Sequence, residues 1–504
     1  MRAFPLCLLL ALAININTSY ATDKYSADNT RLLNNVLYDI NGDPVTGSLE
    51  IFYENNIKKR ESSYINGILD GISTEYDKNG NKERDIPFVN GKIDGIVLEY
   101  YENGSLKTKT PYKNNLIEGI KRSFHENGTV KERISYHANL IDGEKKSYNT
   151  DGTLQESVQY LDNKKNGKSY IYSNKGDIIE TINYQNDIIV GERTIYYPSG
   201  NIRSLIIYKN GLKNGTSINY YENGNIESEV PYQNDILEGT GTFYKDNGDI
   251  DLVVNYKNGK REGTATAYYP NGNERIVVEY KNDTKNGIEI EYYENNSVKS
   301  KTPYVAGIVN GMVSEYNEAS VLKTEALYQN GILNGQTKFY DTNGYLSAEV
   351  NYTSGKKNGI QKNYSPTGIL LSETTYMDDI LNGEYKEFFE SGKIKSSAIY
   401  ENGILNGISV IYDEDGNLSY EIPYKNNKKY GKVKRYYPTG ELMGEVTYEK
   451  GKKHGMLDAF NQDGTLMAKV LFNKDKAIKG YSLDHGKKPV LMTKEELELI
   501  NQSY

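Results

Sequence analysis

The sequence has little of what a conventional globular core is made from. Its 504 residues include one cysteine, no tryptophan and only 37% hydrophobic residues. A single cysteine can form neither an internal disulfide nor a thiolate metal site, so the fold must be stabilised by packing. Tyrosine, in contrast, occupies 47 positions. Whatever this chain buries must therefore be largely tyrosine.

The charges show no long block of one sign. The chain carries 60 Lys and Arg against 68 Asp and Glu, which gives a net charge of −8. This balance argues against a nucleic acid or an anionic membrane surface as a partner held by charge.

The first residues have the pattern of an export signal. Arg2 is followed by an apolar stretch from Phe4 to Ile14 and by a small-x-small site that ends at Ala21. The apolar run is shorter than the roughly 18 residues that a membrane span requires. We therefore expect residues 1–21 to be removed as a signal peptide, together with the one cysteine. The mature chain, without a transmembrane segment, should be exported to the periplasm, the cell surface or the medium.

Residues 47–478 consist of eighteen consecutive copies of a 24-residue unit. We number the positions of the unit from 0, which is glycine in every copy from Gly47 to Gly455. Positions 5 and 17 are aromatic in every copy. A strict period without insertions is typical of a repeat architecture, in which each unit is stabilised by stacking on its neighbours.

Two positions in the unit predict tight turns. Position 9 is glycine in fifteen copies and four prolines fall at position 7, which favours a three-residue hairpin loop at positions 7–9 with a left-handed residue at its end. Position 20 is Gly, Asn or Asp in every copy, and these residues best tolerate a positive φ. Each unit should therefore be a β-hairpin joined to the next by a second turn.

The pattern between the turns predicts which side chains share a face. Apolar and polar residues alternate, as in residues 226–232, with the period of a half-buried strand. An odd loop pairs position 5 with position 11, and uniform alternation then places positions 5 and 17 on one face as two tyrosine ladders. Position 6 falls on the opposite face. Five prolines at position 16 cannot donate to a ladder, so the second strand should end or bulge there.

The predicted fold class is all-β, an elongated array of about eighteen hairpin repeats in a continuous twisted antiparallel sheet. Residues 22–46 contain a partial unit around Tyr38 and should act as a linker and cap before the first repeat. In residues 479–504, the segment 493–496 (TKEE) resembles a capping box before Leu497. We expect a short C-terminal helix that caps the final edge strand.

The unit resembles the MORN repeat variant, the form found in bacterial YwqK-type proteins that are often labelled as antitoxin components. Residues 95–118 (GIVLEYYENGSLKTKTPYKNNLIE) and 215–238 (GTSINYYENGNIESEVPYQNDILE) show its G-x-x-x-x-Y-Y-x-N-G start and Y-x-N-[GD] finish. The eukaryotic form has a Tyr-x-Gly-x-Trp core that is missing here, so lipid binding is not implied. The resemblance implies an elongated sheet that holds a partner protein, with a homodimer left open.

No repeat departs from the common pattern in a way that would indicate a group of catalytic or cofactor-binding residues. The four histidines have no neighbours at metal-ligand spacing. The acidic segment 413–417 lacks the closing glutamate of an EF-hand and occupies an ordinary hairpin loop. The sequence therefore predicts a protein that is not an enzyme and holds no cofactor or metal ion.

Aromatic residues at position 6 are the candidate partner-binding surface. Other repeats carry Asp, Asn, Ser or Lys at this position, so we expect the hairpin itself to be indifferent to a ring there. The alternative is that these rings suit a pleated surface and cover backbone without binding a partner. The eight candidates are Tyr53, Tyr101, Tyr197, Tyr221, Tyr269, Tyr293, Phe389 and Tyr437.

Together these features predict an exported, non-enzymatic scaffold that binds a protein or glycan partner along a tyrosine-rich sheet. A cell-surface rod or adhesin-like spacer is the structural alternative. An exported YwqK-type antitoxin or immunity protein is a further alternative, and it would require a toxin that is exported too.

Overall fold

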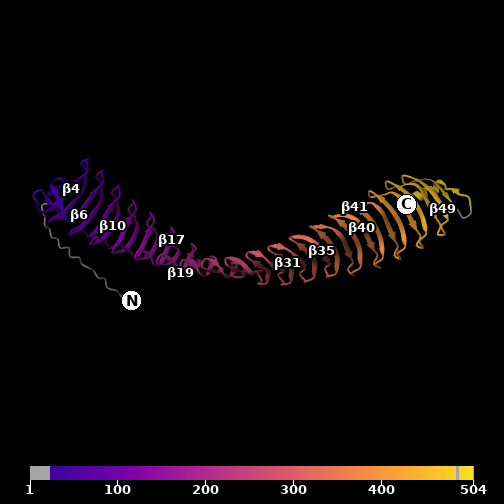
Figure 1. The fold of residues 1–504 in the computed structure, drawn as a ribbon, viewed down its shortest axis with the longest axis horizontal. Coiled ribbons are helices and arrows are strands. Elements are labelled where there is room, and N and C mark those ends of the chain that lie inside the picture. The colour runs from indigo at the N-terminus through magenta and orange to yellow at the C-terminus, as the bar shows by residue number, and fades with distance from the viewer. Residues whose placement is uncertain (1–22, 484–486, 503–504) are drawn as a thin grey trace. The chain divides into compact units, whose positions relative to one another are not determined.

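The computed structural model describes residues 23–483 and 487–502, so the expected signal peptide, residues 1–21, lies outside the described residues. The chain divides into two compact units, residues 1–236 with 246–248 and residues 237–245 with 249–504. Within each unit, β-hairpins follow one another in chain order (Figure 1). The prediction of an all-β array of hairpin repeats is confirmed.

One repeat of the first unit illustrates how the sequence forms a hairpin. β9 (Gly95–Tyr100) covers positions 0–5 and β10 (Leu106–Lys113) covers positions 11–18. Tyr101 N–H donates to the Ser105 carbonyl at 2.8 Å, and Gly104 N–H donates to the Tyr101 carbonyl at 2.9 Å. Gly104 has a φ of +79°. The predicted three-residue loop with a left-handed glycine is therefore present.

The second turn contains two left-handed residues. β11 (Leu116–Ile117) pairs with the end of β10, where Lys113 faces Leu116. Between these strands, Asn114 has a φ of +51° and Asn115 a φ of +69°. Two consecutive positive φ angles define a type I′ turn, whose twist matches that of paired strands. The sequence analysis identified position 20 but not position 19.

Where position 20 is Asn or Asp, its side chain connects the repeat to the one before it. Asn115 N–H donates to the Ile93 carbonyl at 2.9 Å, and Asn115 Oδ1 accepts the Ile93 N–H at 2.7 Å. The same two bonds join Asp475 to Lys453 in the second unit. Position 20 therefore combines a left-handed backbone with a side-chain acceptor, which explains why it is Asn or Asp wherever it is not glycine.

A β-bulge at position 12 determines which face each tyrosine ladder occupies. Gly95 pairs with Tyr112 and Tyr100 pairs with Leu106, but the register shifts by one residue between Leu106 and Thr108. Position 17 therefore pairs with position 0, and the two positions share a face of the sheet. Positions 0 and 5 lie an odd number of residues apart in one unbroken strand, so they belong to opposite faces. A one-residue shift moves side chains to the opposite face. The aromatics of positions 5 and 17 thus lie on opposite faces, and the expectation of two ladders on one face is wrong because it assumed uniform alternation.

Proline at position 16 lies beside the glycine that opens the next repeat. Pro87 stays within β7 (Lys82–Val89), but the ladder between β7 and the next repeat is interrupted at this residue. Asp94 N–H donates to the Pro87 carbonyl at 3.1 Å. Gly95 has a φ of +126°, and a Cβ on it would lie 2.9 Å from Pro87 Cγ. At Gly95 both the backbone and the neighbouring proline exclude a side chain, and the feature that position 0 shares in every copy is its positive φ.

The buried core is narrow and runs along positions 2 and 15. In the second unit, Val254, Ala265 and Val278 form one buried cluster. Ala265 pairs with Val254 on one side and with Val278 on the other. Tyr256 and Tyr280 pack against this cluster. Among the buried side chains of the described residues, Val, Ile, Ala, Ser and Thr predominate and Tyr64 is the one tyrosine, while rings such as Tyr256 are half-buried. The expectation that the buried side chains are largely tyrosine is therefore wrong, because most rings lie beside the core and keep one side exposed.

The residues before the first repeat cover its edge. These N-terminal elements are β1 (Lys24–Ser26), η1 (Ala27–Asn29), β2 (Thr30–Leu33) and β3 (Val36–Asp39), and the first strand of the first repeat is β4 (Gly47–Phe52). β1 pairs with β4 in parallel, unlike the antiparallel hairpins that follow. Leu37 and Val45 are buried against Leu49 and Tyr64 of the first repeat.

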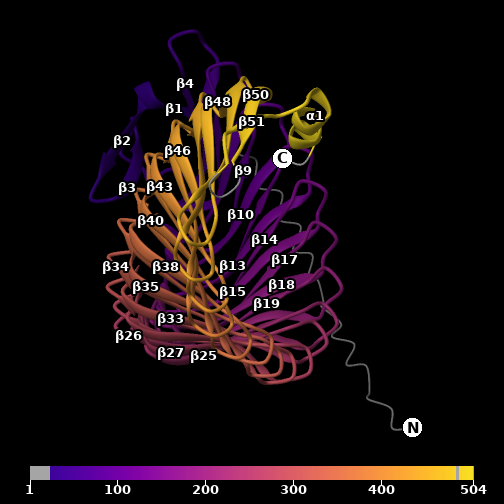
Figure 2. The same ribbon diagram turned by 90° about the vertical axis from the view of Figure 1, so that its right-hand side faces the viewer.

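The C-terminal elements end the second unit. β50 (Lys476–Ser482) pairs with β51 (Val490–Leu491), and α1 (Lys494–Gln502) lies beside β50 (Figure 2). Thr493 Oγ1 accepts the Glu496 N–H at 3.2 Å, and Glu496 Oε2 accepts the Thr493 N–H at 2.7 Å. This reciprocal pair is the capping box. The predicted short C-terminal helix is confirmed.

Candidate functional site

We call the side of the sheet that carries positions 2, 15 and 17 the position-17 face. On it, a Lys or Arg at position 22 lies over the position 17 ring of the next repeat, with the cationic group 4.2 to 5.3 Å from the ring centroid. Such cation–π contacts hold an aromatic ring and leave the charged group able to meet an anion. The seven pairs are Lys165 with Tyr184, Lys213 with Tyr232, Arg261 with Tyr280, Lys285 with Tyr304, Lys357 with Tyr376, Lys429 with Tyr448 and Lys453 with Phe472.

The opposite side, the position-5 face, joins neighbouring repeats through tyrosine hydroxyls. Tyr340 Oη donates to Glu325 Oε2 and Tyr364 Oη donates to Glu349 Oε2, each at 3.0 Å. Burial, together with the hydrogen bond to the carboxylate, raises the pKa of both Tyr340 and Tyr364 to about 12. These hydroxyls are occupied within the sheet, so this ladder is a structural element.

The eight aromatic residues predicted at position 6 are half-buried, and each lies in a different repeat. Tyr269 Oη donates to the Tyr292 carbonyl at 2.8 Å, which is position 5 of the next repeat. Tyr437 makes the same bond to Phe460 at 2.9 Å. The equivalent bond of Tyr53, Tyr101, Tyr197 and Tyr293 reaches Tyr76, Phe124, Tyr220 and Tyr316.

These bonds change the interpretation of position 6. The hydroxyl connects two repeats and satisfies a carbonyl at the end of a strand, so the hairpin is not indifferent to a tyrosine there. Histidine achieves a similar contact, since His125 Nε2 lies 3.2 Å from the Tyr148 carbonyl. Phe389 has no hydroxyl and cannot form the bond. A partner-binding role for the eight rings remains a prediction.

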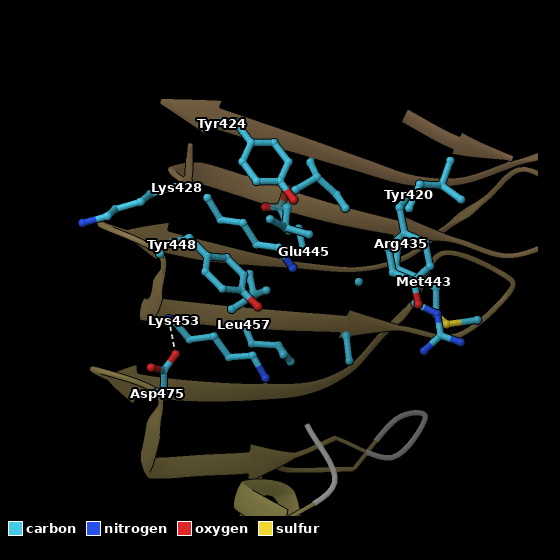
Figure 3. A pocket seen from close by; sticks show the side chains of 18 of the residues that line it. Tyr420, Tyr424, Lys428, Arg435, Met443, Glu445, Tyr448, Lys453, Leu457 and Asp475 are labelled. Atoms are coloured by element: carbon cyan, nitrogen blue, oxygen red, sulfur yellow. Dashed lines mark hydrogen bonds between the residues drawn. The ribbon is translucent and has the colours of Figure 1, made fainter. Parts of the chain in front are cut away.

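A groove of about 970 Å³ lies on the position-17 face of the second unit (Figure 3). Tyr424 and Tyr448 line one side, and Tyr420, Arg435 and Met443 line the other. Its floor is formed by apolar side chains of positions 2 and 15. These are Ile422, Val433, Val446 and Leu457.

Of the eight candidate aromatics, Tyr437 contributes to this groove. The groove's other residues were not predicted from the sequence, because position 17 was expected to form a tyrosine ladder and position 22 was assigned no role. The available signal was the alternation of position 22 between aliphatic and basic residues, as in Leu405 and Lys429. A core position would not tolerate that alternation without a solvent-accessible face beside it.

The groove is cationic in a chain of net negative charge. Lys429 lies 5.3 Å from the Tyr448 ring centroid and Arg435 lies 5.5 Å from that of Tyr420. Burial lowers the pKa of Lys453 below its usual value, and the nearby Lys429 lowers it further against the opposing effect of Asp475. The groove therefore combines aromatic rings, an apolar floor and cations, which suits binding rather than bond-breaking chemistry.

Within residues 23–483 and 487–502, no group of three or more His, Cys, Asp or Glu is arranged to hold a metal ion. No helix in that part of the chain is long and apolar enough to cross a bilayer.

Comparisons with known proteins identify the repeat but no close relative. No curated protein matches the chain. Among solved structures, it is similar to the crystal structure of TcdB2-TccC3-TEV at 11% identity and a TM-score of 0.14, covering 90% of this chain and 30% of that one. It is similar to a Photorhabdus luminescens Tc holotoxin pore at the same identity and TM-score, covering 88% of this chain and 28% of that one. The chain thus spans less than a third of the length of these proteins.

The family model described as MORN repeat variant matches twelve 22-residue segments, which make up just over half of the chain. The segments are residues 69–90, 93–114, 117–138, 141–162, 189–210, 213–234, 261–282, 285–306, 357–378, 381–402, 405–426 and 429–450. Hence the strands that line the groove are repeats of a known type, and this chain belongs to the MORN repeat variant family.

Proposed function

We propose that this chain is an exported, non-enzymatic scaffold that binds a protein partner along the position-17 face. The observation that carries the proposal is the groove, in which rings and cations line an apolar floor between Tyr420 and Met467. Interfaces are enriched in tyrosine and arginine because these side chains bury area and still form directed contacts. Regular repeats provide the extended surface on which such contacts add up.

Export is part of the proposal and rests on the N-terminal pattern. A mature chain that starts at or near Thr22 would lack cysteine, and its stability would not depend on the redox state of its compartment. Mass spectrometry of the purified native protein, with fractionation of the producing cells, tests this. Retention of Met1 or Arg2 would contradict it.

Binding is tested with the mature chain immobilised and exposed to the exported fraction of its own cells. A scaffold retains one protein at a fixed ratio, and Lys429→Gln with Arg435→Gln reduces its retention. A glycan partner would instead appear on a carbohydrate array and not in the protein eluate. A chain that retains nothing in either assay would fit the rod or spacer alternative and contradict the proposal.

A further inference from the structure

The C-terminal helix occupies the same face of the sheet as the groove. Leu497 and Ile500 of α1 pack in one hydrophobic cluster that also contains Val433 and Val446 of the groove floor and Phe472 of the last repeat. The groove and the seat of α1 are therefore adjacent parts of one apolar strip. α1 shows which kind of element this strip accepts.

The helix replaces the contacts that a further repeat would make. Asn501 Oδ1 accepts the Ala477 N–H at 2.7 Å. In the preceding repeat, the equivalent Lys453 N–H is accepted by Asp475 at the same distance. α1 thus lies over the position 17 and position 22 rows, the rows that carry Tyr448 and Lys453 in the groove.

The chemistry of a sheet face favours a helix as the occupant. Backbone groups of the strands beneath the groove are paired with neighbouring strands, as β46 (Gly431–Tyr436) is with β47 (Leu442–Glu449). An extended peptide laid on this face would find no backbone partners, whereas strand addition needs a free edge. A helix satisfies its own backbone and needs only an apolar side to bury.

The charges of the groove favour an acidic helix. No ion pair joins Lys429 or Arg435 to a carboxylate within the described part of the chain; each instead lies over a tyrosine ring. The exposed side of α1 carries Glu495, Glu496 and Glu498. Beneath α1, position 22 is the uncharged Ala477. One repeat earlier, in the groove, position 22 is Lys453. A helix bound in the groove would therefore meet more positive charge than α1 does.

We propose that the groove between Tyr420 and Met467 binds an acidic amphipathic α-helix of a partner protein, seated as α1 is seated on the last repeat. This inference rests on the proposed scaffold function and specifies its site and the chemistry of its partner. Two strands per repeat at about 4.8 Å each give about 10 Å per repeat. The groove from Tyr420 to Met467 crosses about two repeats, or about 20 Å. At about 1.5 Å per residue, a helix of about thirteen residues spans it.

A peptide with the sequence of residues 490–502 is the probe. Its ends are blocked, it carries a fluorophore, and a staple joins positions 495 and 499 because so short a helix is marginal alone. Titration with the full mature chain, followed by fluorescence anisotropy, should show saturable binding with a Kd below about 1 mM. A twin peptide with Glu498→Lys and Gln502→Lys, which keeps the capping residue Glu496, should bind at least about tenfold more weakly.

Variants of the chain locate the site. Lys429→Gln with Arg435→Gln should weaken the acidic peptide about tenfold, as loss of two close charges does. Lys357→Gln is the matched control, because Lys357 makes the same cation–π contact with Tyr376 outside the groove. Photo-crosslinks should map to residues 420–467. Crosslinks confined to residues 472–482 would show displacement of α1 and would overturn the proposal.

Three other results would also overturn it: no saturable binding up to about 1 mM, equal affinity for the two peptides, or equal weakening by the groove and control variants. The scaffold function fails separately. If a partner captured from the exported fraction is retained less by the groove variant while neither peptide binds, the helix is wrong and the scaffold stands; if nothing is captured, the scaffold function itself fails.

Discussion

Asn501 in α1 accepts the backbone N–H of Ala477, the bond that an Asn or Asp at position 20 forms in nine earlier repeats. An edge strand with unpaired N–H groups can pair with another chain. The helix therefore ends the array by imitating the repeat that would follow. Its apolar contacts cover the face and Asn501 satisfies the edge.

Asn501→Ala should weaken the C-terminal cap by about 1 kcal/mol, the usual worth of one such hydrogen bond. Hydrogen exchange of the Ala477 amide should become about fivefold faster, while amides of the central repeats stay unchanged. Asn501→Asp keeps the acceptor oxygen and serves as the control. Equal protection of Ala477 in the Ala and Asp variants would contradict the capping role.

Position 20 and the preceding position 22 also follow a charge rule. Asp occurs at position 20 in five repeats, and in each of them position 22 of the preceding repeat is basic. Asn occurs at position 20 in four repeats, and in each of them position 22 of the preceding repeat is aliphatic. Asp187 accepts the Lys165 N–H at 2.8 Å, whereas Asn115 accepts that of Ile93. A carboxylate gains from a nearby cation, and a neutral amide avoids a charge beside an aliphatic side chain.

A double-mutant cycle tests this rule. Lys165→Ile and Asp187→Asn should each reduce local stability, and the double variant should recover part of the loss because it recreates the Ile93 and Asn115 pair. The coupling should be about 0.5 kcal/mol, as for partly exposed charges. Hydrogen exchange at residue 165 measures it. Strictly additive effects would show that the rule has no energetic basis.

Tyr269→Phe should destabilise its repeat by about 1 kcal/mol because it removes the bond to the Tyr292 carbonyl. This differs from the expectation drawn from the sequence, which treated position 6 as indifferent to folding. The exposed Tyr345 provides the control, since Tyr345→Phe removes a hydroxyl from the surface. Amide exchange around residues 269 and 293 should respond to the first change only. An unaltered exchange rate in Tyr269→Phe would restore the original interpretation.

The sequence predicts the hairpin, its two turns and the caps, because each depends on local chemistry at a fixed position. It fails for the faces because the bulge, at Lys107 in the repeat described above, is not marked by one residue type. Position 12 is Lys, Arg, Glu, Asp, Gln, Ser, Ile, Leu or Met. A signal was present in the cross-strand charges. Lys362 and Glu373 form an ion pair at positions 3 and 14, a register one residue away from that of positions 5 and 11.

The groove was beyond sequence reasoning for a different reason. Tyr424 and Tyr448 have aromatic counterparts in every repeat, and position 22 is aliphatic in some repeats and basic in others, with basic residues both inside and outside the groove. What distinguishes this segment is the combination of small residues at positions 4 and 13, such as Gly444 and Ala459, with flanking Arg435. Only the three-dimensional arrangement brings these positions beside the rings.

The hydrogen bond between Tyr364 and Glu349 predicts a loss of stability at high pH. A tyrosine whose pKa is raised to about 12 in the fold stabilises the fold fully below the ordinary value of about 10. That contribution is lost as the pH rises from there through about 12. Glu349→Gln removes the carboxylate and with it part of the pKa shift of Tyr364, so its melting temperature should fall less than that of the unaltered chain as the pH rises from about 10 to about 12. Glu227→Gln, at an exposed position, should follow the unaltered chain; identical profiles for all three would contradict the coupling.

Deletion of one whole repeat should be tolerated when the charge rule is kept. Removing residues 311–334 places Gly355 beside Val309, where Gly331 stands now, so the neighbours restack with the same contacts. Removing residues 143–166 instead places Asp187 beside Ile141, a pairing that no repeat contains. Removing only residues 311–322 leaves half a hairpin and breaks the register of the second unit. Circular dichroism melts should therefore rank the first deletion nearest to the unaltered chain, the second lower by a few degrees, and the third far below both. If the 12-residue deletion melted like the first deletion, whole repeats would not be the units of stacking. If the two whole-repeat deletions melted alike, the residue at position 20 would not distinguish a basic from an aliphatic residue at the preceding position 22.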